Sequence, residues 1–279
     1  MIAITPAELL LFADFIHGRT GIVLNNTKAY LLESRLAPLL DEYGAKSFTD
    51  FFYGGHRSEE WVARVVDAIS THETSFFRDQ RPFDLLQGKI LPEIIGGRQG
   101  GKGENLPRLQ IWSAACSTGQ EVYSIAMIIA ELLGSDIKRW HITITGTDIS
   151  EAAIKKARQG LYTSYEVERG VPPVLREKYF EPHGEFLKVR ADLQALAVFA
   201  KSNLLGPPES RGVYDLILCR NVAIYFNQEN KQRLFDMLSA SLRPEGILII
   251  GATESLFGVS DRFLRNESCN TAYFQKVRG

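Results

Sequence analysis

Small residues interrupt an apolar segment near the middle of the chain. The segment LQIWSAACSTGQEVYSIA (residues 109–126) is apolar at both ends, and its centre contains Ser113, Ala114, Ala115, Ser117 and Gly119. This pattern predicts a strand, a tight loop and a helix. Small side chains let a ligand approach the loop backbone closely, and the free N–H groups of the helix N-terminus face that ligand. The segment is therefore typical of the nucleotide-like site of an α/β sheet.

A carboxylate follows this loop. Glu121 falls in the first turn of the predicted helix, and Gly119 is the only glycine of the loop, so the G-x-G-x-x-G fingerprint of dinucleotide sites is absent. Glu121 would repel a phosphate but can hold an amino group, which favours an uncharged or cationic adenosyl ligand over a pyrophosphate. The alternative is that Glu121 only complements the helix dipole.

A second carboxylate ends the next predicted strand. The segment WHITITGTDI (residues 140–149) alternates apolar and β-branched residues and then reaches Asp148. An acidic residue one βαβ unit after the first loop binds ribose hydroxyls in nucleoside-binding folds, and we favour this function for Asp148. The alternative is that Asp148 caps the helix that begins near Ser150, although Ser150 is a suitable cap itself.

The chain that must position these residues has the composition of a soluble globular protein. It has 279 residues, 45% of them hydrophobic, and a formal net charge of −1, enough for one large core and a smaller module. The balanced charge argues against a nucleic-acid partner. No apolar segment reaches the roughly 20 residues that span a bilayer, and no signal peptide is evident. We expect a cytoplasmic protein without direct membrane insertion.

The three cysteines, Cys116, Cys219 and Cys269, are widely spaced and odd in number, and no Cys-x-x-Cys motif is present. This predicts neither a disulfide framework nor a metal site. No histidine lies near Cys116 or Cys219 in the sequence, so we interpret both as small buried residues and not as nucleophiles.

The first 80 residues predict a small helical domain. Apolar residues recur at helical spacing over residues 6–16, with Thr5 as a cap, and over 27–43, 48–53 and 59–70, with Gly44 as a stop. The glycine-rich residues 96–103 predict a solvated loop, because no strand precedes them.

An α/β domain follows. Strands are predicted at residues 109–114, 141–147, 213–219 and 246–252 with helices between them, and a final hairpin at Phe263 and residues 271–276. Residues 161–199 break this alternation with prolines and short apolar runs, and predict a small antiparallel insertion. A crossover this long and irregular is usually functional.

Four ordered motifs resemble the CheR family of chemotaxis-receptor methyltransferases: THETSFFR (71–78), WSAACSTGQE (112–121), SNLL (202–205) and LCRNVAIYF (218–226). The resemblance covers nearly the whole chain. It implies an α/β fold in which a Rossmann-like S-adenosylmethionine methyltransferase domain (81–279) follows an N-terminal all-helical domain and linker (1–80). It also implies a small antiparallel β-subdomain inserted at about residues 161–200.

The resemblance implies an activity and a set of site residues. The activity is S-adenosylmethionine-dependent methylation of chemoreceptor glutamates to methyl esters, with S-adenosylhomocysteine as product. Arg78 and Tyr225 would lie near the transferred methyl, and Phe76 and Phe77 would pack the linker in place. The cofactor would contact His72, Thr74, Arg78, Ala114, Glu121, Asp148, Asn203, Leu204, Asn221 and Val222. Relatives carry Asn at the position of His72, which alternatively acts as a hydrogen-bonding spacer.

Two departures from the family pattern concern the receptor. The turn EPHGE (181–185) is shorter than in relatives that dock onto a pentapeptide tether at the receptor C-terminus, so we predict tether-independent binding. The helix from residue 27 keeps Lys28 and Arg35 but has Ala37 and Pro38 where relatives tend to be basic. We therefore expect weaker contact with an acidic receptor helix bundle through this face. Nothing in the sequence suggests an obligate dimer, so we expect a monomer.

The implied chemistry agrees with the residues at hand. A glutamate side chain, with an ordinary pKa of about 4.3, is already ionised at neutral pH and needs no general base. The enzyme must only align and desolvate the reactants. The alternatives are a methyltransferase acting on a nucleic-acid base or a small molecule, a non-catalytic signalling scaffold, and a nicotinamide dehydrogenase. Amino-methylating enzymes that act on adenine or on protein glutamine share an Asn/Asp-Pro-Pro-Tyr-type motif where this chain has RNVAIY (220–225), and the absence of both prolines counts against them.

Overall fold

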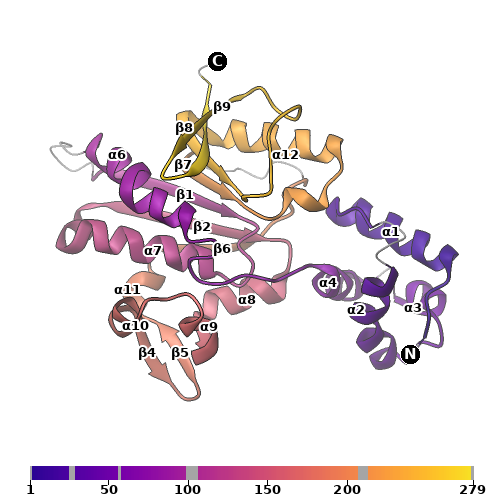
Figure 1. Ribbon diagram of the computed structural model, residues 1–279. Coiled ribbons are helices and arrows are strands. Elements are labelled where there is room, and N and C mark those ends of the chain that lie inside the picture. The colour runs from indigo at the N-terminus through magenta and orange to yellow at the C-terminus, as the bar shows by residue number, and fades with distance from the viewer. Residues whose placement is uncertain (1, 25–28, 56–57, 99–105, 207–212, 278–279) are drawn as a thin grey trace.

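A computed structural model of the chain describes residues 2–24, 29–55, 58–98, 106–206 and 213–277. Four helices gather at one end of the molecule, beside a larger α/β domain from which a small insertion projects (Figure 1). Of the helices within the described residues, none has the length and apolar character needed to cross a bilayer.

The predicted helical domain is confirmed. Its helices are α1 (Pro6–Thr20), α2 (Ala29–Glu42), α3 (Phe48–Gly55) and α4 (Glu59–Ile69). Thr5 caps α1 as predicted, because its side chain accepts a hydrogen bond from the Glu8 amide and Glu8 closes the capping box. Phe12 and Trp61 lie in the aromatic core between the helices. Residues 27 and 28, with which the second helix was expected to begin, lie outside the described residues.

A seven-stranded sheet forms the centre of the larger domain, in the order β6-β2-β1-β7-β8-β10-β9. The first five of these strands are parallel: β6 (Ala197–Lys201), β2 (His141–Asp148), β1 (Arg108–Ala114), β7 (Tyr214–Cys219) and β8 (Leu242–Ile250). The predicted final hairpin, β9 (Phe263–Ser268) and β10 (Thr271–Lys276), continues the sheet in antiparallel pairing. This is the predicted Rossmann-like architecture.

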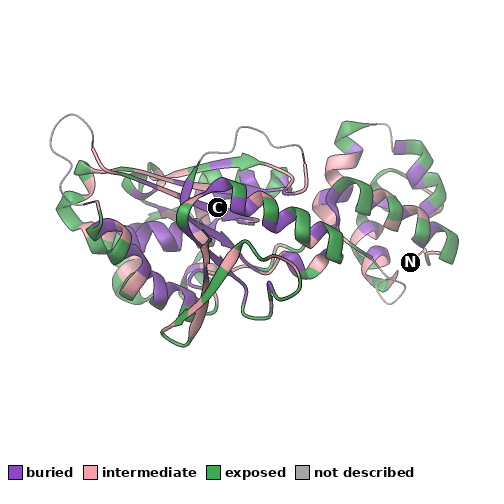
Figure 2. Ribbon diagram, turned by 90° about the horizontal axis from the view of Figure 1, so that it is seen from above, coloured by how far each residue is buried: buried purple, intermediate pink, exposed green. Residues whose placement is uncertain are grey.

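Helices cover both faces of the sheet. One face packs against α5 (Arg81–Leu85), η2 (Leu86–Ile90), α6 (Leu91–Gly96), α7 (Gln120–Leu133) and α8 (Glu151–Gln159). The other face packs against α12 (Gln228–Ser241). Short 3₁₀ helices, η3 (Gly134–Arg139) and η4 (Ala223–Tyr225), follow α7 and β7. Figure 2 shows the buried residues concentrated in the central strands and on the inner helix faces. Most of the expected glycine-rich loop, residues 99–103, lies outside the described residues.

The insertion contains the predicted antiparallel sheet. Its strands β3 (Leu161–Thr163), β5 (Phe186–Val189) and β4 (Phe180–His183) pair in the order β3-β5-β4, and α9 (Ser164–Glu168), α10 (Pro173–Tyr179) and α11 (Ala191–Gln194) pack with them.

The expected end of the insertion, near residue 200, is wrong. Strand β6 pairs in parallel with β2 and belongs to the large sheet. The run LQALAVFAK (193–201) has no glycine or proline between α11 and β6, so no turn signal marks this boundary in the sequence. Strand β8 also differs from its predicted range 246–252, since it starts four residues earlier and ends at Ile250.

Candidate functional site

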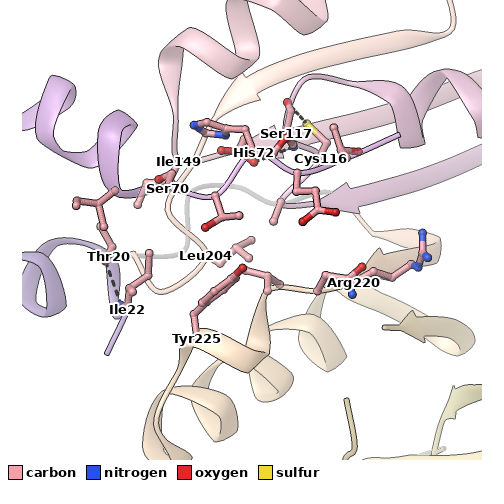
Figure 3. A pocket seen from close by; sticks show the side chains of 18 of the residues that line it. Thr20, Ile22, Ser70, His72, Cys116, Ser117, Ile149, Leu204, Arg220 and Tyr225 are labelled. Atoms are coloured by element: carbon pink, nitrogen blue, oxygen red, sulfur yellow. Dashed lines mark hydrogen bonds between the residues drawn. The ribbon is translucent and has the colours of Figure 1, made fainter. Parts of the chain in front are cut away.

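A pocket opens at the carboxyl ends of β1, β2 and β7, where the sheet meets the helical domain (Figure 3). Ten of the predicted site residues line it: His72, Thr74, Arg78, Glu121, Asp148, Asn203, Leu204, Asn221, Val222 and Tyr225. Residues that lie far apart in the sequence therefore meet at one place. Such a crevice beyond the carboxyl ends of parallel strands is the usual ligand site of an open α/β sheet.

Ala114 is the one predicted site residue that does not line the pocket. It ends β1 and is 1% exposed, whereas the next residue, Ala115, faces the pocket. Ala115 and Ser117 both adopt the left-handed conformation, with φ of 64° and 51°. Such strain in residues other than glycine is typical of functional loops, and it turns the loop backbone toward the ligand side.

Asp148 lies at the centre of the pocket wall. It is 8% exposed, and its carboxylate accepts hydrogen bonds from the amides of Ser117 (2.8 Å) and Ser150 (3.0 Å). The alternative that Asp148 caps the next helix is wrong, because the Ser150 side chain caps α8 by accepting from the Ala153 amide. Asp148 retains lone pairs for a further donor such as a ribose hydroxyl.

Burial raises the pKa of the Asp148 carboxyl, and the amide hydrogen bonds from Ser150 and Ser117 oppose this rise only in part. Burial likewise raises the pKa of the thiols of Cys116 and Cys219, which are 2% and 0% exposed. Both cysteines are thus the buried residues that the sequence predicted, and their thiols stay protonated at neutral pH.

Glu121 faces the pocket from the first turn of α7. Its carboxylate accepts from the Ser113 hydroxyl (2.7 Å) and from Arg220 Nη1 (2.9 Å). Arg220 was not among the predicted site residues. The available signal was a charged residue directly after the apolar strand β7, since a buried charge needs a partner.

The linker from His72 to Arg78 crosses the pocket mouth. The His72 carbonyl accepts from the Ser117 hydroxyl (3.4 Å), and Arg78 Nη1 donates to the Glu73 carbonyl (2.6 Å). Phe76 and Phe77 are 1% and 8% exposed, which confirms the prediction that they pack the linker in place. His72 Nε2 lies 3.3 Å from the Asp67 carbonyl, a contact that suits the spacer interpretation.

The SNLL motif joins the pocket to the helical domain. Asn203 Nδ2 donates to the Arg19 carbonyl (2.8 Å), and its Oδ1 accepts from the Leu205 amide (3.0 Å). Leu204 is 8% exposed and presents apolar surface to the pocket. A flat aromatic ligand group can pack on such a surface.

A carboxylate that was not predicted holds the fourth motif. Glu254 accepts from the amides of Asn221 (3.0 Å), Val222 (3.1 Å) and Ala223 (2.8 Å), and from that of Gly251 (2.7 Å). Asn221 is left-handed, with φ of 59°. Glu254 therefore fixes a strained turn at the pocket edge. Its three partners in this turn lie 31 to 33 residues away in the sequence, which is why no local pattern pointed to Glu254.

The donor set indicates the class of ligand. Asp148 and Glu121 can accept hydrogen bonds from hydroxyl and ammonium groups. The loop between β1 and α7 is not glycine-rich, so it forms no phosphate cradle. No group of His, Cys, Asp and Glu suited to a metal ion occurs within the described residues. The fold and the pocket together define an α/β domain of the nucleoside-binding class, and its donor set suits a ligand that carries hydroxyl and ammonium groups.

Comparisons with known proteins identify the family. The family described as "CheR methyltransferase, SAM binding domain" matches residues 72–272, and "CheR methyltransferase, all-alpha domain" matches residues 7–69. The chain therefore belongs to the CheR methyltransferase family. The resemblance predicted from the four motifs is confirmed, and the methyl donor of this enzyme is S-adenosylmethionine.

Three relatives are called chemotaxis protein methyltransferases. The protein from Vibrio parahaemolyticus is 37% identical, and the match covers 99% of each chain. Chemotaxis protein methyltransferase 1 of Pseudomonas aeruginosa is 36% identical over 92% of this chain and 93% of its own. The Escherichia coli protein is 32% identical over 94% of this chain and 89% of its own. These matches support a methyltransferase of chemotactic signalling.

Proposed function

We propose that the chain transfers the methyl group of S-adenosylmethionine to glutamate side chains of chemoreceptors and forms glutamate methyl esters. The observation that carries this proposal is the meeting of Arg78 and Tyr225, from the linker and from η4, in the same pocket as the carboxylates of Asp148 and Glu121. An arginine and a phenol beside a cofactor pocket suit an acceptor that carries negative charge.

Each end of the pocket suits one part of the cofactor. Asp148 would accept hydrogen bonds from the ribose hydroxyls, and Glu121 would hold the ammonium group. Asn203 and Leu204 would frame the adenine. When bound, the cofactor supplies an electrophilic methyl group on a sulfonium. Asn221 and Val222 would complete the wall beside it.

Arg78 and Tyr225 have positioning functions in this proposal. The incoming glutamate is already ionised, so no residue must remove a proton. Arg78 would orient the carboxylate with its guanidinium, and the Tyr225 hydroxyl would limit how the reactants move. Excessive attraction by Arg78 would stabilise the ground state and slow the transfer. Misplacement of reacting atoms by about 1 Å costs on the order of 100-fold in rate.

Alkali treatment of the methylated receptor tests the proposal. The enzyme is incubated with tritiated S-adenosylmethionine and the cytoplasmic fragment of a chemoreceptor from the same organism. A glutamate methyl ester releases its label as methanol in mild alkali, whereas a methylated nitrogen keeps it. We expect labile label, and stable label or no label would contradict the proposal.

Arg78→Ala is the variant for this assay. We expect turnover to fall about 100-fold, while the affinity for S-adenosylhomocysteine changes little. Arg81→Ala removes an exposed arginine three residues further along the chain and is the matched control, with wild-type turnover.

We also propose that receptor binding does not need a C-terminal pentapeptide. The turn between β4 and β5 consists only of Gly184 and Glu185. In the helical domain, Arg35 is engaged internally, because it donates to the carbonyls of Ile69 and Ser70; Lys28 lies outside the described residues. Receptor fragments with and without the last five residues should be methylated at equal rates. A large loss on truncation would contradict tether-independent binding.

A further inference from the structure

Arg220 is a buried cation at the junction of three elements. It follows β7, and its side chain is 3% exposed. Nη1 donates to Glu121 Oε2 (2.9 Å) at the start of α7. Nη2 donates to Asp79 Oδ2 (2.8 Å) and to the Arg78 carbonyl (2.8 Å) in the linker. One guanidinium therefore binds both the Glu121 carboxylate and the backbone of Arg78, the residue proposed to orient the acceptor.

The charges of this cluster are not balanced within it. Glu121 and Asp79 each carry one negative charge at neutral pH, and Arg220 carries one positive charge, so the three side chains sum to −1. An ammonium group at Glu121 would bring the sum to zero. The Glu121 side chain is 12% exposed and that of Asp79 is 44% exposed. Glu121 therefore loses more of its hydration, and its ion pair with Arg220 compensates for a larger desolvation cost.

The linker backbone is strained around the two residues that Arg220 contacts. Phe77, Asp79 and Gln80 have φ of 50°, 64° and 24°, conformations that residues other than glycine rarely adopt. Arg220 Nη2 bonds to Arg78 and Asp79 in the middle of this strained stretch. The Arg220 guanidinium carbon also lies 5.5 Å from the centre of the Phe83 ring, just beyond the linker.

We propose that Arg220 is a positioning residue that couples cofactor binding at Glu121 to the placement of Arg78. This rests on the proposed function, in which Arg78 orients the acceptor. The coupling is physical because both ends share one guanidinium. A ligand that forms a new hydrogen bond with Glu121 weakens or moves the bond from Arg220 Nη1 to Glu121. Because the guanidinium is rigid, the bonds from Nη2 to Asp79 and to the Arg78 carbonyl change with it.

Loss of Arg220 removes the cation between Glu121 and Asp79. The Glu121 carboxylate would keep its hydrogen bond from the Ser113 hydroxyl but lose the guanidinium that orients it, so the affinity for the cofactor should fall.

Two variants of Arg220 test the coupling. Arg220→Met should weaken S-adenosylhomocysteine binding by about tenfold or more. Arg220→Lys keeps the charge but lacks the planar guanidinium, whose Nη1 and Nη2 bond to Glu121 and to the linker. Its affinity should stay within about threefold of wild type, while turnover falls by about tenfold or more.

Hydrogen exchange reports the linker without any turnover. In the wild-type protein, S-adenosylhomocysteine should slow exchange of the amides at residues 77–80, and in Arg220→Lys this protection should be lost. The control is Arg98→Met, which breaks an ion pair with the buried Asp215 at the amino end of β7, the end of that strand opposite to Arg220. It should lower the melting temperature without changing the affinity or the linker protection.

The outcomes separate this proposal from the proposed function. Wild-type affinity, turnover and linker protection in both Arg220 variants would overturn the coupling. A lowered melting temperature without these changes would also overturn it, because Arg220 would then serve only the fold. If Arg220→Met does not fold, Arg220→Lys and its exchange pattern decide. Failure of the methyl-ester assay in the wild-type protein would reject the glutamate acceptor, whereas the binding and exchange results would stand.

Discussion

At the level of single residues, Asp148 combines burial and a carboxylate in the pocket wall. Two amides hold its carboxylate on the pocket wall, at 8% exposure. Burial raises the pKa of this carboxyl. The folded protein therefore holds a proton at Asp148 more tightly than the unfolded chain does. The stability that this group contributes is present at low pH and is lost as the pH rises through the raised pKa.

The same shift predicts the pH dependence of cofactor binding. An ionised Asp148 is the better acceptor for ribose hydroxyls, so affinity should fall as the pH is lowered toward the raised pKa. The fall should begin at a higher pH than for an ordinary aspartate, whose pKa is about 3.9. Asp148→Asn should bind S-adenosylhomocysteine more weakly and without this component of the pH profile. Calorimetry across the acidic range measures both.

The control for this prediction is Asp14→Asn, on the exposed face of α1, which should keep the wild-type profile. An unchanged profile in Asp148→Asn would contradict the assignment of the titration to Asp148.

Pocket residues that follow a local pattern could be predicted from the sequence, whereas residues that hold distant segments together could not. Asp148 and Glu121 stand at fixed places after a strand and in a helix turn. Arg220 and Glu254 act on partners from distant segments, such as Glu121 and Asn221, and only folding brings these together. Ala114 ends β1 with its side chain buried and does not line the pocket, whereas the next residue, Ala115, does.

At the level of elements, the turn after β7 depends on the end of β8. Glu254 binds three successive amides of that turn and also the Gly251 amide. A Cβ atom at Gly251 would lie 2.7 Å from Glu254 Oε2 and 3.0 Å from the Asn221 nitrogen. Only glycine permits this close approach, so two strand ends and the turn carrying Asn221 form one packed unit.

Gly251→Ala should therefore disturb the site as well as the fold. We expect a loss of about 1–3 kcal/mol in the free energy of unfolding, together with weaker binding of S-adenosylhomocysteine. Denaturant unfolding and calorimetry measure the two effects. Gly88→Ala, in a helix with nothing within 4 Å of the added atom, is the control and should be neutral or slightly stabilising. Wild-type affinity in Gly251→Ala would contradict the inference that Gly251 and Glu254 hold the turn carrying Asn221 in place.

Strands and helices with strong periodicity were predictable, and boundaries without turn residues were not. The hairpin β9–β10 has polar and left-handed residues, Cys269 and Asn270, between two alternating runs. Strand β6 has no such marker before it and was assigned to the insertion. Its place beside β2 is set by sheet pairing, a long-range effect.

At the level of the whole molecule, the helical domain forms part of the pocket. α1 ends at Gly21, with φ of 76°, and the chain then turns to the segment that carries Tyr225. The Val23 amide donates to the Tyr225 carbonyl (2.9 Å), and Ile22 pairs with Phe226. Thr20 and Ile22 line the pocket opposite the sheet loops (Figure 3).

Gly21→Ala should therefore weaken cofactor binding from outside the α/β domain. The left-handed conformation costs a residue with a Cβ atom about 1–2 kcal/mol, and the added atom would lie 2.1 Å from Leu205 Cδ1. We expect a lower melting temperature and lower affinity for S-adenosylhomocysteine. Gly18→Ala, in the same helix and with nothing within 4 Å, should leave both unchanged or slightly raise stability. Unchanged affinity in Gly21→Ala would show that the helical domain does not shape the pocket.

Calorimetric titration of the wild-type chain and of Asp148→Ala with S-adenosylhomocysteine and with NAD tests the account most directly. The account predicts one saturable site per wild-type chain for S-adenosylhomocysteine and no binding of NAD. It also predicts affinity lower by about tenfold or more in Asp148→Ala, since a hydrogen bond to a charged group contributes about 1.5–3 kcal/mol. Equal affinity in the two proteins, or comparable binding of NAD, would contradict a pocket built around Asp148 for an adenosyl cofactor.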